Sequence, residues 1–355
     1  MPENVRLLTV AEALLEGTRQ VMAEDERVIV IGEGVPDPKG IFGTTLGLRG
    51  EFGVDRVFDM PVAENGMTGV VIGAALAGMR PILTHQRLDF SLYSLDQIIN
   101  NAAKWHFMFG GQSSVPIVIR MMIGRGWGQG AQHSQNLQAL FAHIPGLKVV
   151  MPATASDAKG LLVASVRDNN PVIFLEHRWV HGLRGEVEED LYEVELGKAH
   201  VLRKGSDITI VSSSYMTVEG LRAAEVVSGL GVSAEVVDLR TIRPLDMETI
   251  IGSVRKTGRL LVVDSGWMTG GLPGEIIMRV LEAEVDLTIN PRRVSLPDMP
   301  TPTSPALTKG FYKTYKDVVA TVCNMMNKDP GAFEAAWDQE EVAHDVPGAS
   351  FIGPF

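Results

Sequence analysis

The chain lacks several features on which common classes of protein depend. Its 355 residues contain one cysteine, Cys323, which excludes an intrachain disulfide and any metal site built from several cysteines. Acidic side chains outnumber basic ones by 43 to 32, and the net charge of −11 argues against a surface for nucleic acids. No run of about eighteen apolar residues occurs, so we expect no membrane span. The first four residues, Met1–Asn4, resemble neither a signal peptide nor an arginine-rich transit peptide, and we expect a cytoplasmic protein.

Motifs that bind nucleotide phosphates or metals are also missing. The chain has no P-loop and no Gly-x-Gly-x-x-Gly motif after a predicted strand. Of its eight histidines, those other than His133 have no spacing that indicates a metal triad.

The chain does have the apolar content and the alternation of elements that build α/β domains. With 45% apolar residues in 355, it has enough for a large core and for two domains. Short apolar runs alternate with helical patterns, which predicts parallel sheets covered by helices on both faces, in three layers. The polar stretch 178–204 interrupts this rhythm. We therefore predict a first domain at 1–190, a linker at 191–204, a second domain at 205–326 and a tail at 327–355.

The most informative segment runs from Asp59 to Gly78. The carboxylate of Glu64 lies between a short apolar strand and a run rich in glycine and alanine. A helix with such small side chains allows another backbone or a flat ligand to approach closely. A carboxylate at its start is suited to proton exchange. The alternative is a glutamate favoured at this position by the helix dipole alone.

The segment resembles the one that holds the catalytic glutamate in the β subunits of thiamine-diphosphate-dependent 2-oxoacid dehydrogenases. These are the decarboxylating components of the pyruvate, branched-chain and acetoin complexes. The similarity covers about residues 5–325 in unbroken order, and its strongest strings are 58–64, 95–104, 132–135, 145–150, 167–171 and 238–246. The resemblance implies a transketolase-like pyrimidine-binding domain followed by a transketolase C-terminal-like domain.

The resemblance assigns the cofactor pocket to four residues. Glu64 would bind a ring nitrogen of the aminopyrimidine and favour the imino tautomer, and Phe90 would stack on the same ring. Such stacking contributes about 0.5–1.5 kcal/mol beyond burial. Met60 and Val62 would line the pocket. Without the resemblance, Phe90 would be interpreted as a core aromatic residue.

His133 would face the reactive end of the cofactor and assist transfer of the acyl group to lipoyl, as a second catalytic residue. A neutral histidine suits this role. The alternative is a loop histidine bonded to the main chain.

The segment 85–89, His-Gln-Arg-Leu-Asp, departs from the usual apolar or aromatic pattern of the family. If it lines the substrate funnel, Arg87 would meet a substrate carboxylate, with Gln86 beside it. The identity of the 2-oxo acid is therefore left open.

A structural potassium site is also implied by the resemblance. It would use oxygen ligands from Ile117, Ser165, Val166, Asp168 and Asn170, near the carbonyl end of a helix. The alternative is that Arg-Asp-Asn-Asn-Pro ends the helix without an ion.

The chain has no Gly-Asp-Gly motif, which in such enzymes begins the site for the diphosphate and its magnesium. The resemblance thus implies half a site, completed by an α subunit that holds the magnesium in an α₂β₂ heterotetramer. A lipoyl-bearing acyltransferase core and a small 2-oxo acid are the other expected partners. Two alternatives stay open, namely a transketolase-like half-enzyme that transfers a ketol or acyl unit without lipoyl, and a non-catalytic paralogue.

Overall fold

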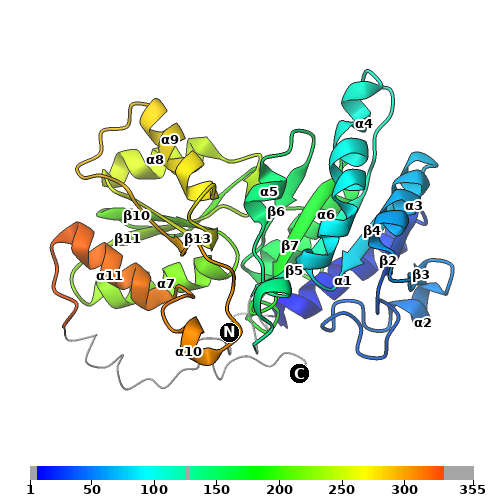
Figure 1. Cartoon of the computed structure of the whole chain (residues 1–355), viewed down its shortest axis with the longest axis horizontal. Coiled ribbons are helices and arrows are strands. Elements are labelled where there is room, and N and C mark those ends of the chain that lie inside the picture. Colours follow the sequence, from blue (N-terminus) through cyan, green and yellow to red (C-terminus); the bar gives the residue numbers. More distant parts are fainter. Residues whose placement is uncertain (1–5, 125–127, 332–355) are drawn as a thin grey trace.

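The computed structural model describes residues 6–124 and 128–331, which form two α/β domains packed against each other (Figure 1). No helix in this part of the chain is both long and apolar enough to cross a membrane.

The first domain is built on a seven-stranded sheet in the order β12-β6-β7-β5-β4-β2-β3. Six strands are parallel, and their buried apolar runs are typical of a sheet covered on both faces. The strands are β2 (Val28–Gly32), β3 (Val57–Phe58), β4 (Arg80–His85), β5 (Val118–Ile123), β6 (Lys148–Val150), β7 (Val172–His177) and β12 (Thr241–Arg243).

Alternate residues of this sheet belong to two separate apolar clusters, one on each face. Helices α1 (Val10–Glu24), α2 (Leu48–Phe52) and α6 (Ala155–Arg167) contribute to one cluster. Helix α3 (Glu64–Leu76), the 3₁₀ and π segments η1 (Leu88–Ser94) and η2 (Asp96–Ala102), α4 (Ala103–Met108) and α5 (Gln138–Ala142) cover the other face. A small ribbon of β1 (Leu7–Thr9) and β8 (Arg184–Glu186) lies beside α1, and a 3₁₀ turn, η3, spans Gly130–Gln132.

The second domain has a five-stranded sheet in the order β14-β13-β10-β11-β9. Its strands are β9 (His200–Arg203), β10 (Ile208–Ser212), β11 (Ala234–Asp238), β13 (Leu260–Trp267) and β14 (Arg292–Leu296). In Figure 1 this sheet lies between two pairs of helices, α8 (Met247–Thr257) with α9 (Leu272–Glu282) and α7 (Tyr215–Ser228) with α11 (Tyr315–Met326). The short α10 (Pro305–Thr308) precedes α11.

The predicted two-domain α/β fold is confirmed, but three local expectations were wrong. Residues 200–203, assigned to the linker, form β9, which pairs antiparallel with β11. Residues 241–243, placed within the second domain, form β12, which pairs antiparallel with β6 of the first sheet. Each sheet is thus parallel except for one edge strand. The sequence pattern also predicts one helix from about Leu92 to Phe109, and the structure divides this stretch into the end of η1, η2 and α4.

The domains share one continuous core. The apolar cluster on the α3–α5 face of the first sheet extends to Ile250 of α8 and Ile276 of α9. Polar contacts also cross the boundary, since Gln138 Nε2 donates to Asp264 Oδ1 at 2.7 Å and Asn136 Nδ2 donates to the Ser265 carbonyl at 2.9 Å. Most of the predicted tail, residues 332–355, lies outside the described residues.

Candidate active site

Three predicted site residues and one further glutamate, Glu33, follow four neighbouring strands of the first sheet. Glu33 follows β2, Glu64 follows β3, Phe90 follows β4 and His133 lies in the loop after β5. These strands lie side by side in the order β5-β4-β2-β3 and run parallel, so their carboxyl ends meet at one edge. Open α/β sheets bind their ligands at this edge. The fold therefore brings together residues separated by up to 100 positions.

Glu64 begins helix α3 and is buried, with 8% of its surface exposed. The first turn is tied to the neighbouring segment η1, because Thr68 Oγ1 bonds both the Glu64 carbonyl, at 2.7 Å, and Ser94 Oγ, at 3.0 Å. Residue Ala63, before the helix, provides no side-chain cap. The main-chain N–H groups of this helix start are therefore not capped by the side chain that precedes them.

Glu33 is a neighbour of Glu64 that the sequence interpretation missed. Burial and the nearby carboxylates of Glu64 and Asp59 raise the pKa of Glu33. Its position directly after a strand, in Gly32-Glu33-Gly34, was the available signal. Three carboxyl groups, those of Glu33, Asp59 and Glu64, thus gather at the ends of β2 and β3.

The residues beside these carboxyl groups differ in their exposure. Asp59 Oδ1 accepts from the Gly34 and Met60 main-chain N–H groups, at 3.0 and 2.9 Å, which fixes the loop after β3. Met60 is 6% exposed and belongs to the first domain's core. Val62 is 81% exposed. The pocket roles of both remain predictions, with Met60 packed behind the site and Val62 on an open side.

Phe90 and His133 are in direct contact. Their ring centroids are 5.2 Å apart and their planes are nearly perpendicular, at 87°, which is a favourable edge-to-face arrangement. The His133 loop approaches the second domain closely at Gly130, where φ is +64° and a Cβ atom would lie 2.2 Å from Thr303 Oγ1. Glycine is therefore required there.

The two predicted substrate residues lie differently. Gln86 is exposed, and its Nε2 donates to the Glu33 carbonyl at 3.2 Å. Arg87 is 5% exposed, donates to the Gly124 carbonyl at 3.2 Å, and also bonds Gln129 Oε1. Burial lowers the pKa of Arg87 to about 10, at which it stays charged near neutral pH. A contact of Arg87 with substrate stays a prediction. The hydrogen bonds that Arg87 makes join it to the loop that contains His133.

The predicted potassium ligands lie in the last turn of α6, in the turn that follows it and directly before β5. The Ile117 carbonyl accepts from Val172 N at 2.9 Å, and Ser165 Oγ donates to the Leu161 carbonyl at 2.6 Å. The Asp168 carboxylate accepts from Asn170 N at 2.8 Å. It also pairs with Lys148.

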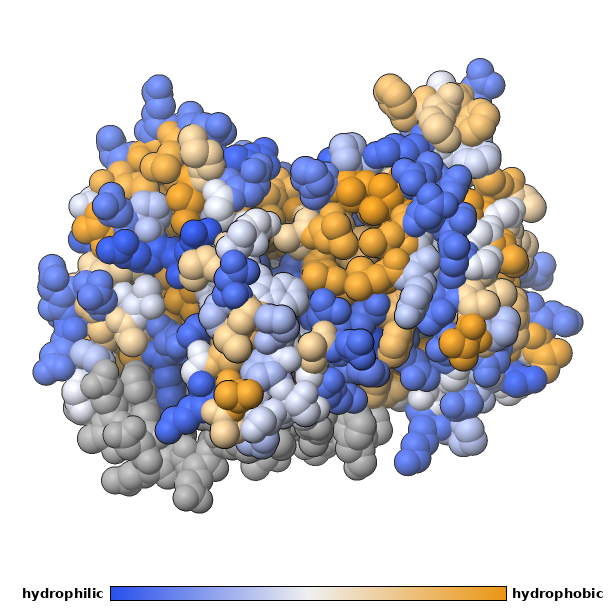
Figure 2. All heavy atoms as spheres, viewed as in Figure 1, coloured by the Kyte–Doolittle hydropathy of each residue, from blue (hydrophilic) through white to orange (hydrophobic). Residues whose placement is uncertain are grey.

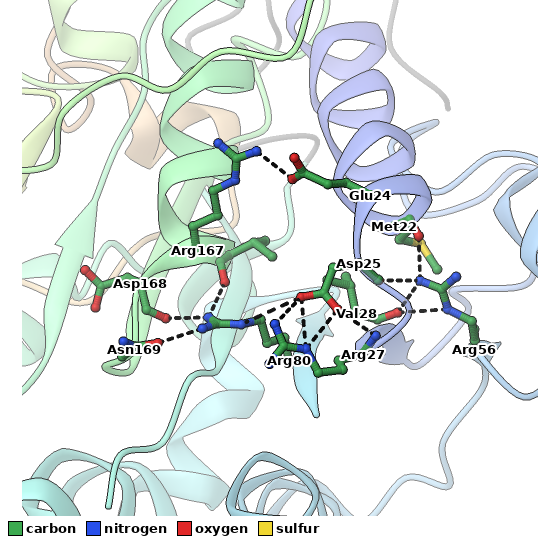
Figure 3. Close-up of polar contacts among 11 residues, drawn as sticks. Met22, Glu24, Asp25, Arg27, Val28, Arg56, Arg80, Arg167, Asp168 and Asn169 are labelled. Carbon is green, nitrogen blue, oxygen red and sulfur yellow. Dashed lines mark hydrogen bonds and ion pairs between the residues drawn. The ribbon is translucent and has the colours of Figure 1, made fainter. Parts of the chain in front are cut away.

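Arg80 approaches the same chain turn, as Figure 3 shows. Its Nη1 donates to the Val166 and Asp168 carbonyls, at 2.9 and 3.1 Å, and its Nη2 to Asn169 Oδ1 at 2.6 Å. Each carbonyl oxygen has a second lone pair. Potassium binding at this oxygen-only set remains a prediction, and two of its carbonyl oxygens already accept from the Arg80 guanidinium. Among the described residues, no group of three or more His, Cys, Asp or Glu side chains could hold a metal ion.

A cavity of about 1100 Å³ lies between the domains, away from Glu64 and His133. It is lined by residues of α5, β12 and α9, among them Leu140, Ile242 and Leu272, and Asn170 is the one predicted site residue in its lining. Figure 2 shows apolar side chains gathered at the hollow where the domains meet.

These two domains define a chain of the transketolase type. The model described as "Transketolase, pyrimidine binding domain" matches residues 7–180, and "Transketolase, C-terminal domain" matches residues 197–318. A solved structure, "Split gene transketolase, inactive beta4 tetramer", aligns with a TM-score of 0.73 and 25% identity, over 89% of this chain and 98% of the other. Domains of this type imply thiamine diphosphate as the cofactor.

The relatives narrow the class further. The pyruvate dehydrogenase E1 component subunit beta of Rickettsia felis is 42% identical over 316 residues, which cover 89% of this chain and 97% of the relative. The acetoin:2,6-dichlorophenolindophenol oxidoreductase subunit beta of Cupriavidus necator is 42% identical over 332 residues, with coverages of 90% and 98%. The mitochondrial pyruvate dehydrogenase E1 subunit beta of Bos taurus is 40% identical, with coverages of 90% and 91%. The chain belongs to this family, the β subunits of thiamine-dependent 2-oxoacid dehydrogenases, and is thus an oxidoreductase component.

Proposed function

We propose that this chain supplies the aminopyrimidine half of a thiamine site, in which a 2-oxo acid is decarboxylated and its acyl unit passed to a lipoyl group. The observation that carries the proposal is that Glu64 and the Phe90–His133 pair follow parallel strands, β3, β4 and β5, whose carboxyl ends lie at one edge of the same sheet. A carboxyl group, an aromatic face and an imidazole are the three groups that such a site needs from the protein.

Each residue has one task in this proposal. Bound thiamine diphosphate supplies the carbon that takes up the acyl unit. Glu64 holds a proton at a pyrimidine ring nitrogen, and Phe90 stacks on that ring while Met60 and Val62 border it. His133 donates a proton or stabilises negative charge as the acyl unit leaves for lipoyl. Gln86 and Arg87 are the candidates for contact with the carboxylate of the 2-oxo acid.

A partner subunit completes the site in this proposal. The chain lacks the Gly-Asp-Gly motif, and apolar side chains around Glu64 stay exposed, namely Val62 at 81%, Tyr93 at 71% and Val70 at 60%. On α3, a Cβ added at Gly66 or Gly73 would meet no atom within 4 Å, so this face of the helix is open to another backbone. We propose an α subunit that covers this face and holds the diphosphate and magnesium in an α₂β₂ heterotetramer. A lipoyl-bearing acyltransferase core would be the acceptor.

We also propose that potassium binds at the oxygen ligands of Ile117, Ser165, Val166, Asp168 and Asn170. The support is the all-oxygen set near the carbonyl end of α6. A cytoplasmic location stays a prediction as well, since the Bos taurus relative is named as mitochondrial.

The proposal is tested by co-purification with a candidate α subunit and assays with thiamine diphosphate and magnesium. A panel of 2-oxo acids is offered with 2,6-dichlorophenolindophenol as electron acceptor, and then with a lipoyl domain. We expect turnover from the mixed complex and none from either chain alone. A well-formed complex that binds the cofactor and oxidises no 2-oxo acid would overturn the proposal.

A second candidate function is a transketolase-like half-enzyme that transfers a ketol or acyl unit without lipoyl. The observation that favours it is the structural match to a split-gene transketolase. Ketol transfer from a sugar phosphate by the same complex, without 2-oxo acid oxidation, would establish it. A complex that binds the cofactor and catalyses neither reaction would favour the non-catalytic paralogue.

A further inference from the structure

The segment after β4 holds the His133 loop at three points. Arg87 bonds the Gly124 carbonyl and Gln129 Oε1. Asp89 Oδ1 accepts from the main-chain N and from Nε2 of Gln135, at 3.3 and 2.9 Å. Phe90 then meets the His133 ring edge to face. Three residues of one segment, Arg87, Asp89 and Phe90, thus contact the loop before, at and after the histidine.

Both charged side chains of this segment are buried. Arg87 is 5% exposed and Asp89 is 7% exposed, and burial raises the pKa of Asp89. Buried charged groups are held in place by their hydrogen bonds, because a lost partner leaves a desolvated charge unsatisfied. The contacts of Arg87 and Asp89 are therefore fixed features of the folded chain.

Gln129 is held from a second direction. Arg178, which follows β7 and is 1% exposed, donates from Nη1 to Gln129 Oε1 at 2.9 Å. One amide oxygen thus accepts from two guanidinium groups that come from two different strands of the sheet. Gln129 lies four residues before His133, and Gln135 lies two residues after it.

We propose that Arg87 and Asp89 are positioning residues that hold the loop on both sides of His133 and keep its imidazole against Phe90. This inference rests on the proposed function, in which His133 acts during acyl transfer. A displacement of about 1 Å in a catalytic group reduces rates by about a hundredfold, so anchors on both sides of the histidine have a direct effect on turnover.

The substrate role predicted for Arg87 would require a different orientation of its guanidinium group. A substrate carboxylate would need guanidinium N–H groups that face an open funnel. If Arg87 binds substrate, its replacement raises KM for the acid, and replacement of Gln129 does not. If Arg87 positions the loop, its replacement lowers kcat, and replacement of its partner Gln129 lowers kcat as well.

The first test measures the geometry of His133 in the isolated chain, without any need for activity. The chain is labelled with ¹³C at histidine Cε1, and the His133 signal is assigned with His133→Gln. We expect Arg87→Met and Gln129→Leu to move this signal in the same direction as Phe90→Leu, which removes the contact ring. The double variant Arg87→Met/Gln129→Leu should move the signal by less than the sum of the two single variants, because the Arg87–Gln129 bond is already broken in each of them.

The second test uses the complex with its α subunit, with pyruvate as the probe acid and a lipoyl domain as acceptor. We expect Arg87→Met and Gln129→Leu each to lower kcat 10- to 100-fold, with KM for pyruvate within twofold. Arg292→Met, at an exposed arginine of β14, should match the wild type. If Arg87→Met fails to fold, Asp89→Asn and Gln135→Leu replace it. Asp89→Asn keeps the acceptor oxygen, so the His133 signal should stay at its wild-type position. Gln135→Leu removes the donor, so the signal should move.

Two results would overturn the inference. One is an unchanged His133 signal in both Arg87→Met and Gln129→Leu. The other is a rise of tenfold or more in KM with unchanged kcat in Arg87→Met alone, which would make Arg87 a substrate ligand. If the complex oxidises no 2-oxo acid, the proposed function fails while the signal of His133 still decides the positioning role.

Discussion

At the scale of single residues, Glu64 combines partial burial with an open approach. The helix that it begins is tied to η1 through Thr68, and Val62 and Tyr93 on the neighbouring segments are exposed. This environment is consistent with the proposal that a second chain encloses the ligand of Glu64. The acidic neighbour Glu33 adds a group with a raised pKa beside it.

Replacement of Glu64 by glutamine should abolish turnover of the assembled complex and leave assembly intact. Glutamine keeps the size of the side chain and removes the proton exchange on which the proposed role depends. Rates are measured with thiamine diphosphate and magnesium, and assembly by size-exclusion chromatography. Glu248→Gln, an exposed glutamate in the first turn of α8, is the matched control and should keep full activity. Near-normal rates in Glu64→Gln would remove Glu64 from the mechanism.

Asp238 should make stability depend on pH. It is fully buried at the end of β11, and burial and the Asp157 carboxylate raise its pKa to about 7. The unfolded value is about 3.9, so the folded state binds the extra proton between these limits. The stabilisation is complete below about pH 4 and is lost as pH rises through 7.

Asp238→Asn should therefore raise Tm relative to the wild type more at pH 8.5 than at pH 5.5. Thermal unfolding at both pH values measures this difference. Asp286→Asn, at an exposed position, should change Tm equally little at both. An equal effect of Asp238→Asn at the two pH values would contradict the raised pKa.

Motif strings predicted which residues gather at the sheet edge, and the structure brings Phe90 and His133 into contact. The contacts of Arg87 could not be predicted in this way. Its partner Gln129 lies 42 residues further along the chain, and no local pattern pairs an arginine with a glutamine at that distance. Glu33 was missed because a single acidic residue after a strand is common in loops.

At the scale of elements, the sequence predicted helices and strands correctly where a single pattern of apolar residues ran through the whole element. Helices α3 and α6 and strands β2, β4 and β5 have continuous apolar or small-residue runs. Helical periodicity could not separate α from π or 3₁₀ geometry in 88–108, because apolar residues spaced three to five apart satisfy all three. The edge strands β9 and β12 are short and only partly apolar, and their pairing depends on partners far away in sequence.

Potassium should stabilise the turn that follows α6. An ion that binds the folded state and not the unfolded state raises Tm as the concentration of the ion increases. We expect a higher Tm in potassium chloride than in choline chloride at equal ionic strength, and a smaller difference in Asn170→Ala. Asn169→Ala, which loses a contact with Arg80 at this turn, should keep the difference. Equal Tm values in the two salts would show that Arg80 and Lys148 provide all the positive charge that this turn requires.

At the scale of the whole molecule, the chain has two complete domains and, in the proposed function, half of the cofactor site. Its isolated form should bind thiamine diphosphate weakly or not at all, because nothing in the sequence matches the diphosphate and magnesium motif. Isothermal titration calorimetry of the chain alone and of the α–β complex, both with magnesium, measures this. Tight magnesium-dependent binding by the chain alone would sink the half-site proposal.

Strand β12 has a consequence for how the chain unfolds. It comes from the second half of the sequence and completes the edge of the first domain's sheet through its pairing with β6. A cut in the connection at 191–199 would therefore leave the halves joined by main-chain hydrogen bonds and by a shared core. Neither half is an autonomous folding unit in this arrangement, and the two should melt in a single cooperative transition.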